Sequence, residues 1–130
     1  MITIEEFAKV EIRIGTVLSA TKVPEADRLI QILFDFGDMP EQEPEGLERL
    51  PELVEKYPGR DVRQIMSAIA PFYPDPSELV GKQIAVCVNL EPRKFKGYLS
   101  QGMIMATDTE DGLISLLTPE KKVKPGSKIH

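Results

Sequence analysis

Residues 9–20 read KVEIRIGTVLSA, and their pattern predicts the first strand of the fold. Apolar side chains at Val10, Ile12 and Ile14 alternate with charged ones between them. A period of two predicts a strand with one buried face. Gly15 interrupts the alternation, which predicts a bulge or a sharp bend. The opening strand is therefore expected to belong to a sheet that curls.

Two further stretches predict buried strands. Residues 28–36 (RLIQILFDF) alternate apolar and polar side chains, whereas residues 82–90 (KQIAVCVNL) are almost continuously apolar. The first pattern indicates one buried face and the second indicates burial on both faces. Between the first two strands, residues 22–27 contain Pro24 and residues of poor strand propensity, which predicts a turn.

Shorter elements complete the outline of the chain. Strands are predicted at residues 63–70, 102–107 and 113–117, and a short capped helix at 75–81. Asp111-Gly112 predicts a hairpin turn between the last two strands. Pro125-Gly126 predicts a type II turn close to the end of the chain.

Five or six short strands with a bulged first strand predict an all-β fold. The expected architecture is a five-stranded Greek-key barrel of the OB-fold type, with a short helix and N- and C-terminal extensions. A sandwich with a similar number of strands remains an alternative. In an OB fold the ligand face lies beside the loops that join strands one to two and four to five. Those loops are residues 22–27 and 91–101 here.

The acidic charge of the chain is unevenly distributed. The chain has 130 residues and a net charge of −5, and its length predicts a single domain over residues 1–130. Residues 38–62 carry eight acidic and three basic side chains, so this stretch has a charge of −5 and the rest is neutral. Residues 38–62 are predicted to be an acidic insertion that carries one or two helical turns. A basic surface elsewhere can still meet phosphate, because charge acts over about 8 Å in physiological salt.

The composition argues against several classes of protein. Cys87 and His130 are the only cysteine and histidine, so the sequence predicts no disulfide, no metal site and no catalytic residues. Neither an enzyme nor a cofactor is expected. The chain has no apolar run of about 18 residues and no secretory leader, which predicts a cytoplasmic protein without membrane contact.

Residues 89–103 (NLEPRKFKGYLSQGM) are the strongest candidate for a binding site. Arg93, Lys94 and Lys96 alternate with aromatic residues at 95 and 98. Basic groups neutralise phosphates, and aromatic faces stack on unpaired bases at about 1 to 3 kcal/mol each. The alternative is a solvated loop that Phe95 and Tyr98 anchor to the barrel.

Four more residues are candidates for contact with a nucleic acid. Asn89 and Ser100 offer hydrogen-bonding groups to base edges or to a 2′-hydroxyl. Met103 offers a polarizable apolar surface to a base. Arg28 follows the first loop, where either a phosphate contact or a surface ion pair explains it.

Four segments of the sequence resemble a known family. The segments FAKVEIRIGTVLSATKVPEADRL, SAIAPFY, SELVGKQIAVCVNLEPRKFKGYLSQGM and LLTPEKKVKPGSKI are similar to the tRNA-binding domain. That domain occurs as a stand-alone dimeric protein, at the C-terminus of methionyl-tRNA synthetases and in endothelial monocyte-activating polypeptide II. The resemblance implies an OB fold, a homodimer and tRNA binding without strong sequence preference. It places five residues on the tRNA-contacting surface: Asn89, Arg93, Lys94, Ser100 and Met103.

The resemblance leaves two functions to compare. One is a non-catalytic tRNA-binding protein that acts in trans, with an aminoacyl-tRNA synthetase as a candidate partner. The other is a peptide-binding export chaperone of the CsaA-like branch, which is similar in the first strand and at Asp35-Phe36-Gly37. That branch usually lacks the basic loop RKFKG, so the tRNA-binding reading is preferred.

The chain departs from the family pattern at three places. Ala68 and Gln101 stand where relatives often carry glycine and glutamate, and the resemblance does not cover residues 38–62. The acidic insertion could repel tRNA if it folds over the binding face. It could also point away and serve the dimer or another protein, or it could be a neutral insertion, since loop closure costs little entropy.

Overall fold

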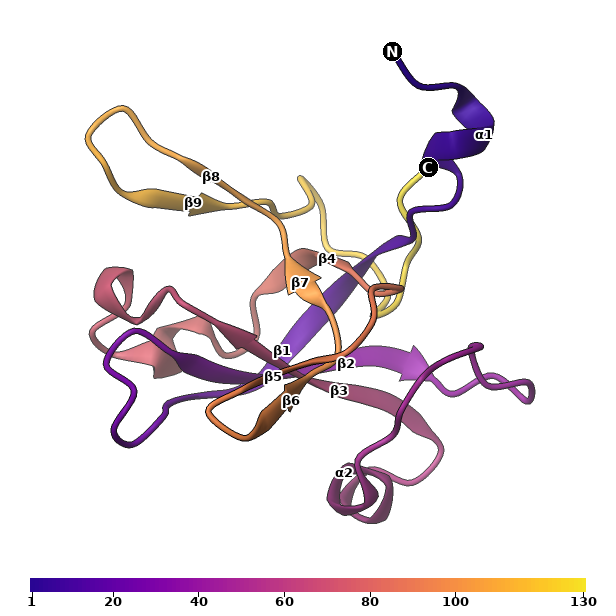
Figure 1. Cartoon of the computed structure of the whole chain (residues 1–130), viewed down its shortest axis with the longest axis horizontal. Coiled ribbons are helices and arrows are strands. Elements are labelled where there is room, and N and C mark those ends of the chain that lie inside the picture. Colours follow the sequence, from indigo (N-terminus) through magenta and orange to yellow (C-terminus); the bar gives the residue numbers. More distant parts are fainter.

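The structure, a computed structural model, describes all residues from 1 to 130 (Figure 1). Its largest sheet has five antiparallel strands in the order β3-β2-β1-β4-β7, and two hairpins, β5–β6 and β8–β9, lie outside it. None of the helices is both long and apolar enough to cross a membrane. The elements are α1 (Ile4–Phe7), β1 (Ile12–Lys22), β2 (Ile30–Asp38), α2 (Pro51–Lys56), β3 (Arg60–Ser67), the 3₁₀ turns η1 (Ala70–Phe72) and η2 (Pro76–Leu79), β4 (Gln83–Cys87), β5 (Arg93–Phe95), β6 (Tyr98–Ser100), β7 (Met103–Ile104), β8 (Ala106–Asp108) and β9 (Ile114–Leu116).

Strand β1 curls because its two halves pair with different strands. Its first half, up to Thr16, pairs with β4, and the half that starts at Thr16 pairs with β2. The predicted bulge exists, but it lies between Val17 and Ser19 and not at Gly15. Gly15 serves another purpose, because a Cβ there would come within 2.7 Å of Phe34 Cδ1 and 2.8 Å of Phe36 Cε1. The glycine therefore makes room for two core aromatic rings.

The far edge of β3 is covered by β6 and by Gln101, the residue that follows it. The Gln101 amide donates to the Gln64 carbonyl at 2.8 Å, and the Gln64 side chain donates to the Leu99 carbonyl at 2.9 Å. The Met66 amide donates to Ser100 Oγ at 3.0 Å. The sheet thus curls from β3 round to β7 and the chain returns to β3. These contacts confirm the predicted all-β, OB-like barrel.

The core lies inside this curl. The alternation of residues 28–36 is confirmed in burial, because every second side chain from Ile30 to Phe36 is buried while those between them, Leu33 included, are partly exposed. The continuous burial of β4, with the Cys87 thiol inside, is also confirmed. The largest fully buried side chains are Phe34, Ile30, Ile32, Ile65, Leu79, Ile84, Val17 and Val86.

Several predicted boundaries were wrong. The strand predicted at 63–70 spans residues 60–67, and the helix predicted at 75–81 is the short 3₁₀ turn η2, which Asp75 caps. The strand predicted at 102–107 is broken at Met105, whose amide donates to the Ala85 carbonyl. Past that point the chain leaves the main sheet, and β8 and β9 project as a hairpin (Figure 1). Val10 is exposed, because β1 begins only at Ile12.

Candidate nucleic-acid interface

The predicted basic loop is an ordered hairpin. Strands β5 and β6 pair antiparallel, with Arg93 opposite Ser100 and Phe95 opposite Tyr98. Lys96 and Gly97 form the turn between them, with φ of +52° and +85°. Positive φ at both central residues is the geometry of a type I′ turn, which matches the twist of two strands. Gly97, the glycine after Lys96, was a sequence signal for this turn that the sequence analysis missed. We call residues 93–100 the basic hairpin.

The basic hairpin packs on the loop between β1 and β2. Val23 and Ala26 from that loop form a small apolar cluster with Met66, and Phe95 and Tyr98 pack against it. The two loops therefore lie side by side, as the OB fold predicts. Both aromatic side chains are partly buried here, so they anchor the hairpin as the alternative interpretation proposed. Arg28, in the same region, is exposed and forms no ion pair.

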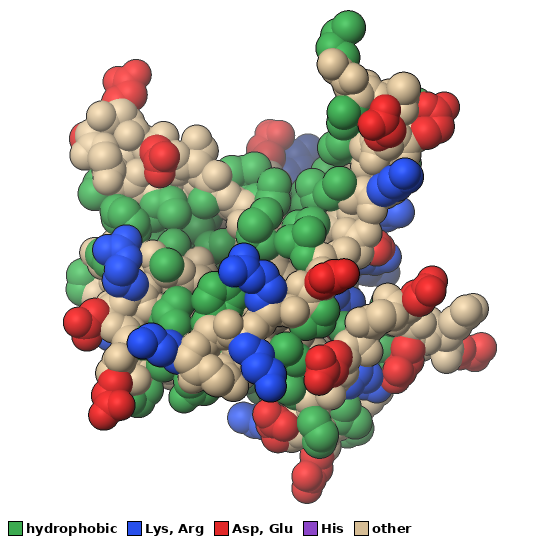
Figure 2. Space-filling view, in the orientation of Figure 1, with side chains coloured by type: hydrophobic (Ala, Val, Ile, Leu, Met, Phe, Trp, Pro, Cys, Tyr) green, Lys and Arg blue, Asp and Glu red, His purple; other side chains and the backbone are tan.

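The three cations of the hairpin are free to meet an anion. Arg93, Lys94 and Lys96 are exposed, and no carboxylate lies within ion-pair distance of them. Arg93 and Phe95 share one face of β5, with the guanidinium carbon 5.3 Å from the ring centre. Lys94 faces the other way, because side chains alternate along a strand. The basic groups in the middle of Figure 2 lie over this part of the fold.

Asn89 and Ser100 use their polar groups inside the protein. The Asn89 amide donates to the Lys9 carbonyl at 2.7 Å and accepts from the Glu11 amide at 2.8 Å. The buried Ser100 hydroxyl accepts from Met66 and donates to the Gly102 carbonyl at 3.1 Å. These side chains hold the two ends of the hairpin segment in place. Ser100 is buried and its hydroxyl hydrogen is used inside the protein, whereas Asn89 is exposed and keeps one side-chain N–H free for a ligand.

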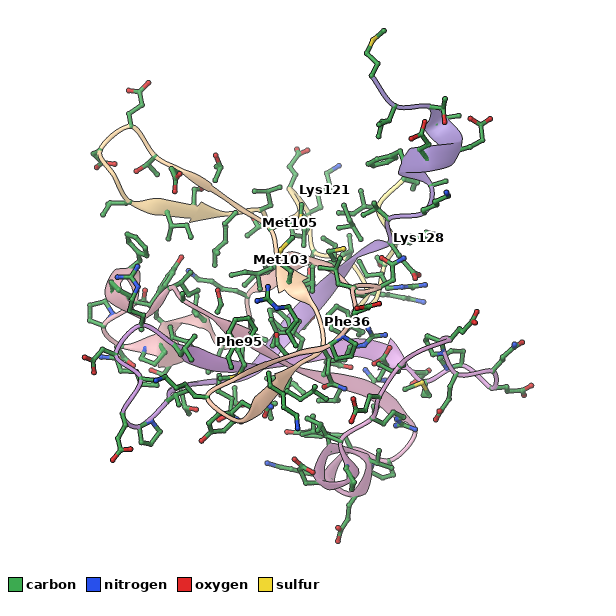
Figure 3. The ribbon with its side chains drawn as sticks, in the orientation of Figure 1. Phe36, Phe95, Met103, Met105, Lys121 and Lys128 are labelled. Atoms are coloured by element: carbon green, nitrogen blue, oxygen red, sulfur yellow. The ribbon has the colours of Figure 1, made fainter.

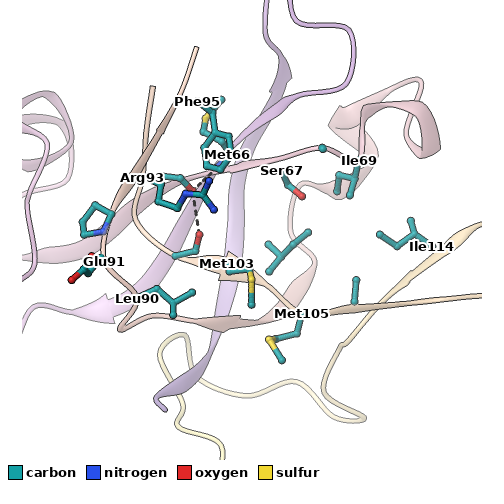
Figure 4. Close-up of a pocket in the computed structure, with 16 residues that line it drawn as sticks. Met66, Ser67, Ile69, Leu90, Glu91, Arg93, Phe95, Met103, Met105 and Ile114 are labelled. Atoms are coloured by element: carbon teal, nitrogen blue, oxygen red, sulfur yellow. Dashed lines mark hydrogen bonds between the residues drawn. The ribbon is translucent and has the colours of Figure 1, made fainter. Parts of the chain in front are cut away.

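A groove of about 880 Å³ adjoins the basic hairpin. We call it the apolar groove, because ten of its sixteen lining residues are hydrophobic. Arg93 and Phe95 lie at one end, Met105 and Ile114 at the other, and Met103 between them (Figures 3 and 4). Met103 is 51% exposed, so its thioether is accessible from solvent. The groove is the hollow apolar area in the upper half of Figure 2.

A buried ion pair supports the start of the hairpin segment. Arg63 on β3 is 3% exposed and binds both carboxylate oxygens of Asp61, at 2.9 and 3.1 Å. Its remaining terminal nitrogen donates to the Val88 carbonyl at 2.7 Å. The chain therefore leaves β4 at a fixed point just before Asn89.

Residues 38–62, which we call the acidic segment, lie beside the site and not away from it. The Gln101 side chain joins the two, because its oxygen accepts from the Gln64 amide at 2.8 Å and its nitrogen donates to the Glu48 carbonyl at 2.5 Å. A second groove, of about 490 Å³, separates the acidic segment from residues 88–92. The side-chain hydrogen bond with Asp35 raises the pKa of Arg60, so this cation of the segment is fully engaged.

Replacing Gln101 with glutamate should loosen the acidic segment. A carboxylate still accepts from the Gln64 amide, but it has no hydrogen to donate to the Glu48 carbonyl. We expect a protease specific for glutamate to cleave Gln101→Glu faster between residues 41 and 48 than it cleaves the parent. Equal cleavage rates in limited proteolysis would show that Gln101 does not hold the segment.

The sequence of this chain is similar to a known domain family and to parts of longer proteins. Residues 54–128 match the family model described as "Putative tRNA binding domain". The chain belongs to the tRNA-binding domain family. It is 43% identical to a methionine–tRNA ligase from Parabacteroides distasonis over 128 residues and 42% identical to one from Archaeoglobus fulgidus. Each match covers 98% of this chain and 16% of the relative, so the chain spans about a sixth of those proteins.

Solved structures of the family have the same fold. A MetRS related protein from Pyrococcus horikoshii is 30% identical, with a TM-score of 0.75 over 100% of this chain and 98% of that one. The chaperone CsaA from Bacillus anthracis is 27% identical, with a TM-score of 0.73 over 100% and 99% of the two chains. The domain is thus similar in structure both to a MetRS related protein and to the chaperone CsaA.

Proposed function

We propose that this chain is a non-catalytic tRNA-binding domain that docks tRNA on the basic hairpin. The observation that carries the proposal is three exposed, unpaired cations on an ordered hairpin beside an open apolar groove. Phosphates supply most of the affinity in such a complex, and Arg93, Lys94 and Lys96 neutralise them. Arg28, across the neighbouring loop, extends the same cationic surface.

The apolar groove is suited to an unpaired base. Met103 and the accessible part of Phe95 offer flat or polarizable surfaces on which any base can lie. Arg93 lies at the groove edge, where it can hold the phosphate of the same nucleotide. Asn89 and Ser100 contribute by positioning the hairpin. Binding of this kind depends on backbone path and exposed bases more than on sequence.

A titration with unfractionated tRNA tests this function. Filter binding at two salt concentrations should show an affinity that falls steeply as the salt concentration rises, because phosphate contacts release counterions. Undetectable binding, or binding that ignores salt, would remove tRNA as the ligand.

The competing function is a peptide-binding chaperone. The apolar groove is compatible with it, because an extended apolar peptide can also lie in such a groove, but the structural similarity to CsaA does not favour it over tRNA binding. The free cations of the hairpin favour tRNA. A chemically unfolded polypeptide that binds while tRNA does not would establish the chaperone function instead.

We also propose a homodimer in which the terminal extensions meet. Helix α1 buries none of its own residues, and its Ile4 and Phe7 are exposed. The helix lies beside the C-terminal segment (Figure 1). Exposed apolar side chains that cluster in this way mark protein interfaces. A dimer presents two tRNA sites and raises the affinity for a single large ligand.

We propose further that the chain forms one domain with an acidic insertion. It acts in trans in the cytoplasm, with a synthetase as a candidate partner.

The double variant Ile4→Glu/Phe7→Glu should be monomeric, because charges at a closed interface have no partner. Sedimentation velocity measures the result directly. Val54→Glu is the control: Val54 is exposed on α2, far along the chain from α1, and its substitution should leave the dimer intact. A parent protein that sediments as a monomer would contradict the proposed dimer.

A further inference from the structure

We propose that the acidic segment is a fixed electrostatic barrier at one side of the tRNA site. It lowers the affinity for RNA and keeps the RNA backbone on the hairpin side of residues 90–92. This inference rests on the proposed function and adds to it a reason for the direction in which RNA leaves the site.

Most carboxylates of the acidic segment carry an uncompensated charge. Of its eight acidic residues, Asp38, Glu43 and Asp61 form ion pairs with arginines. Lys56 forms no ion pair and lies 5.5 Å from the Tyr57 ring. Five exposed carboxylates remain without an ion-pair partner: Glu41, Glu45, Glu48, Glu52 and Glu55.

These charges are held in place by the fold. The base of the segment is closed by a hydrogen bond from the Met39 amide to the Gly59 carbonyl at 2.9 Å. Its middle is held by the hydrogen bond from the Gln101 side chain to the Glu48 carbonyl. Its helix α2 is anchored by the buried side chain of Leu53. A segment fixed at three points cannot swing aside when an anion approaches. Its charge therefore acts at the same place in the free and the bound protein.

The position of the segment gives the site a direction. Residues 90–92 line both grooves, so they form a ridge between the apolar groove and the second groove, which we call the acidic groove because Glu11, Glu45 and Glu91 line it. Glu45 lines the acidic groove together with Glu91, and Arg93 lies just past the ridge in the apolar groove. In Figure 2 the carboxylates at the lower right border the basic groups of the hairpin. A phosphate that crosses the ridge comes close to several carboxylates. At physiological salt their repulsion acts over about 8 Å before it is screened.

Removing the charge of the barrier should tighten RNA binding. In the variant Glu45→Gln/Glu48→Gln/Glu52→Gln the hydrogen bond to Gln101 is kept, because it uses the Glu48 backbone. We expect tRNA affinity to rise about three- to ten-fold at ~50 mM salt and less than about two-fold at ~300 mM, as screening increases. Glu78→Gln/Asp108→Asn/Glu110→Gln is the matched control, with the same loss of charge on η2 and on the β8–β9 hairpin, away from the terminal extensions.

The outcomes separate the barrier from the proposed function. A gain in the barrier variant alone, lost at high salt, supports the barrier. Equal gains in both variants would show an effect of net charge and overturn it. If the barrier variant binds like the parent while alanines at Arg93, Lys94 and Lys96 weaken binding, the barrier fails and the tRNA function stands. If those alanines also have no effect, both proposals fail.

Discussion

Alanine at Arg93, Lys94 and Lys96 together is expected to weaken tRNA binding about 100-fold at ~0.1 M salt. Each cation that neutralises a phosphate contributes about 0.7 to 0.9 to the slope of log K against log salt concentration. Loss of three such contacts should therefore reduce the slope by about 2 to 3. Since all three side chains are exposed and without ion pairs, and only the Arg93–Phe95 contact is lost, the melting temperature should fall by no more than a few degrees.

The control removes the same charge from another surface. Lys121, Lys122 and Lys124 are in the C-terminal segment, and their replacement with alanine should cost much less affinity. Filter binding of both variants beside the parent makes the comparison. Equal losses would mean that net charge, and not the hairpin, drives binding.

Arg63→Ala is expected to destabilise the fold by about 3 to 5 kcal/mol, because it leaves the buried Asp61 carboxylate without its partner. It also removes the donor to the Val88 carbonyl at the start of the hairpin segment. The melting temperature should fall by about 10 °C or more for a chain of this size. Denaturant titration measures the free energy of unfolding, and scanning calorimetry measures the melting temperature.

Arg49→Ala is the matched control for the buried pair. Arg49 pairs with Glu43 at 2.7 Å, but these side chains are 24% and 51% exposed. Solvent screening limits the worth of such a pair to less than about 1 kcal/mol. A loss at Arg63 no larger than the loss at Arg49 would refute the role given to the buried pair.

Much of the fold could be predicted because its pattern is local. The alternation over Ile30–Phe36 and the continuous apolar run of β4 report burial directly, residue by residue. The place of the bulge could not be predicted from Gly15. That glycine responds to the rings of Phe34 and Phe36, which reach it only after the sheet has curled.

The exposure of the cations in the candidate site could be predicted for the same reason. Charged side chains on a polar loop face solvent in most folds, so residue type was enough to expect that Arg93, Lys94 and Lys96 are exposed. Asn89 and Ser100 are different, because their partners Lys9 and Met66 are distant in sequence. Nor could the sequence place the acidic segment, whose middle is held by a hydrogen bond from Gln101 to the backbone carbonyl of Glu48, a residue distant in sequence.

The salt dependence of tRNA binding tests the proposed function most directly. A titration of the parent protein from ~50 to ~300 mM salt should give a straight line of log K against log salt concentration, with a slope of about −2 or steeper. The line should become markedly flatter when Arg93, Lys94 and Lys96 are replaced with alanine. A parent slope near zero, or the same slope in parent and variant, would contradict tRNA docking on the basic hairpin.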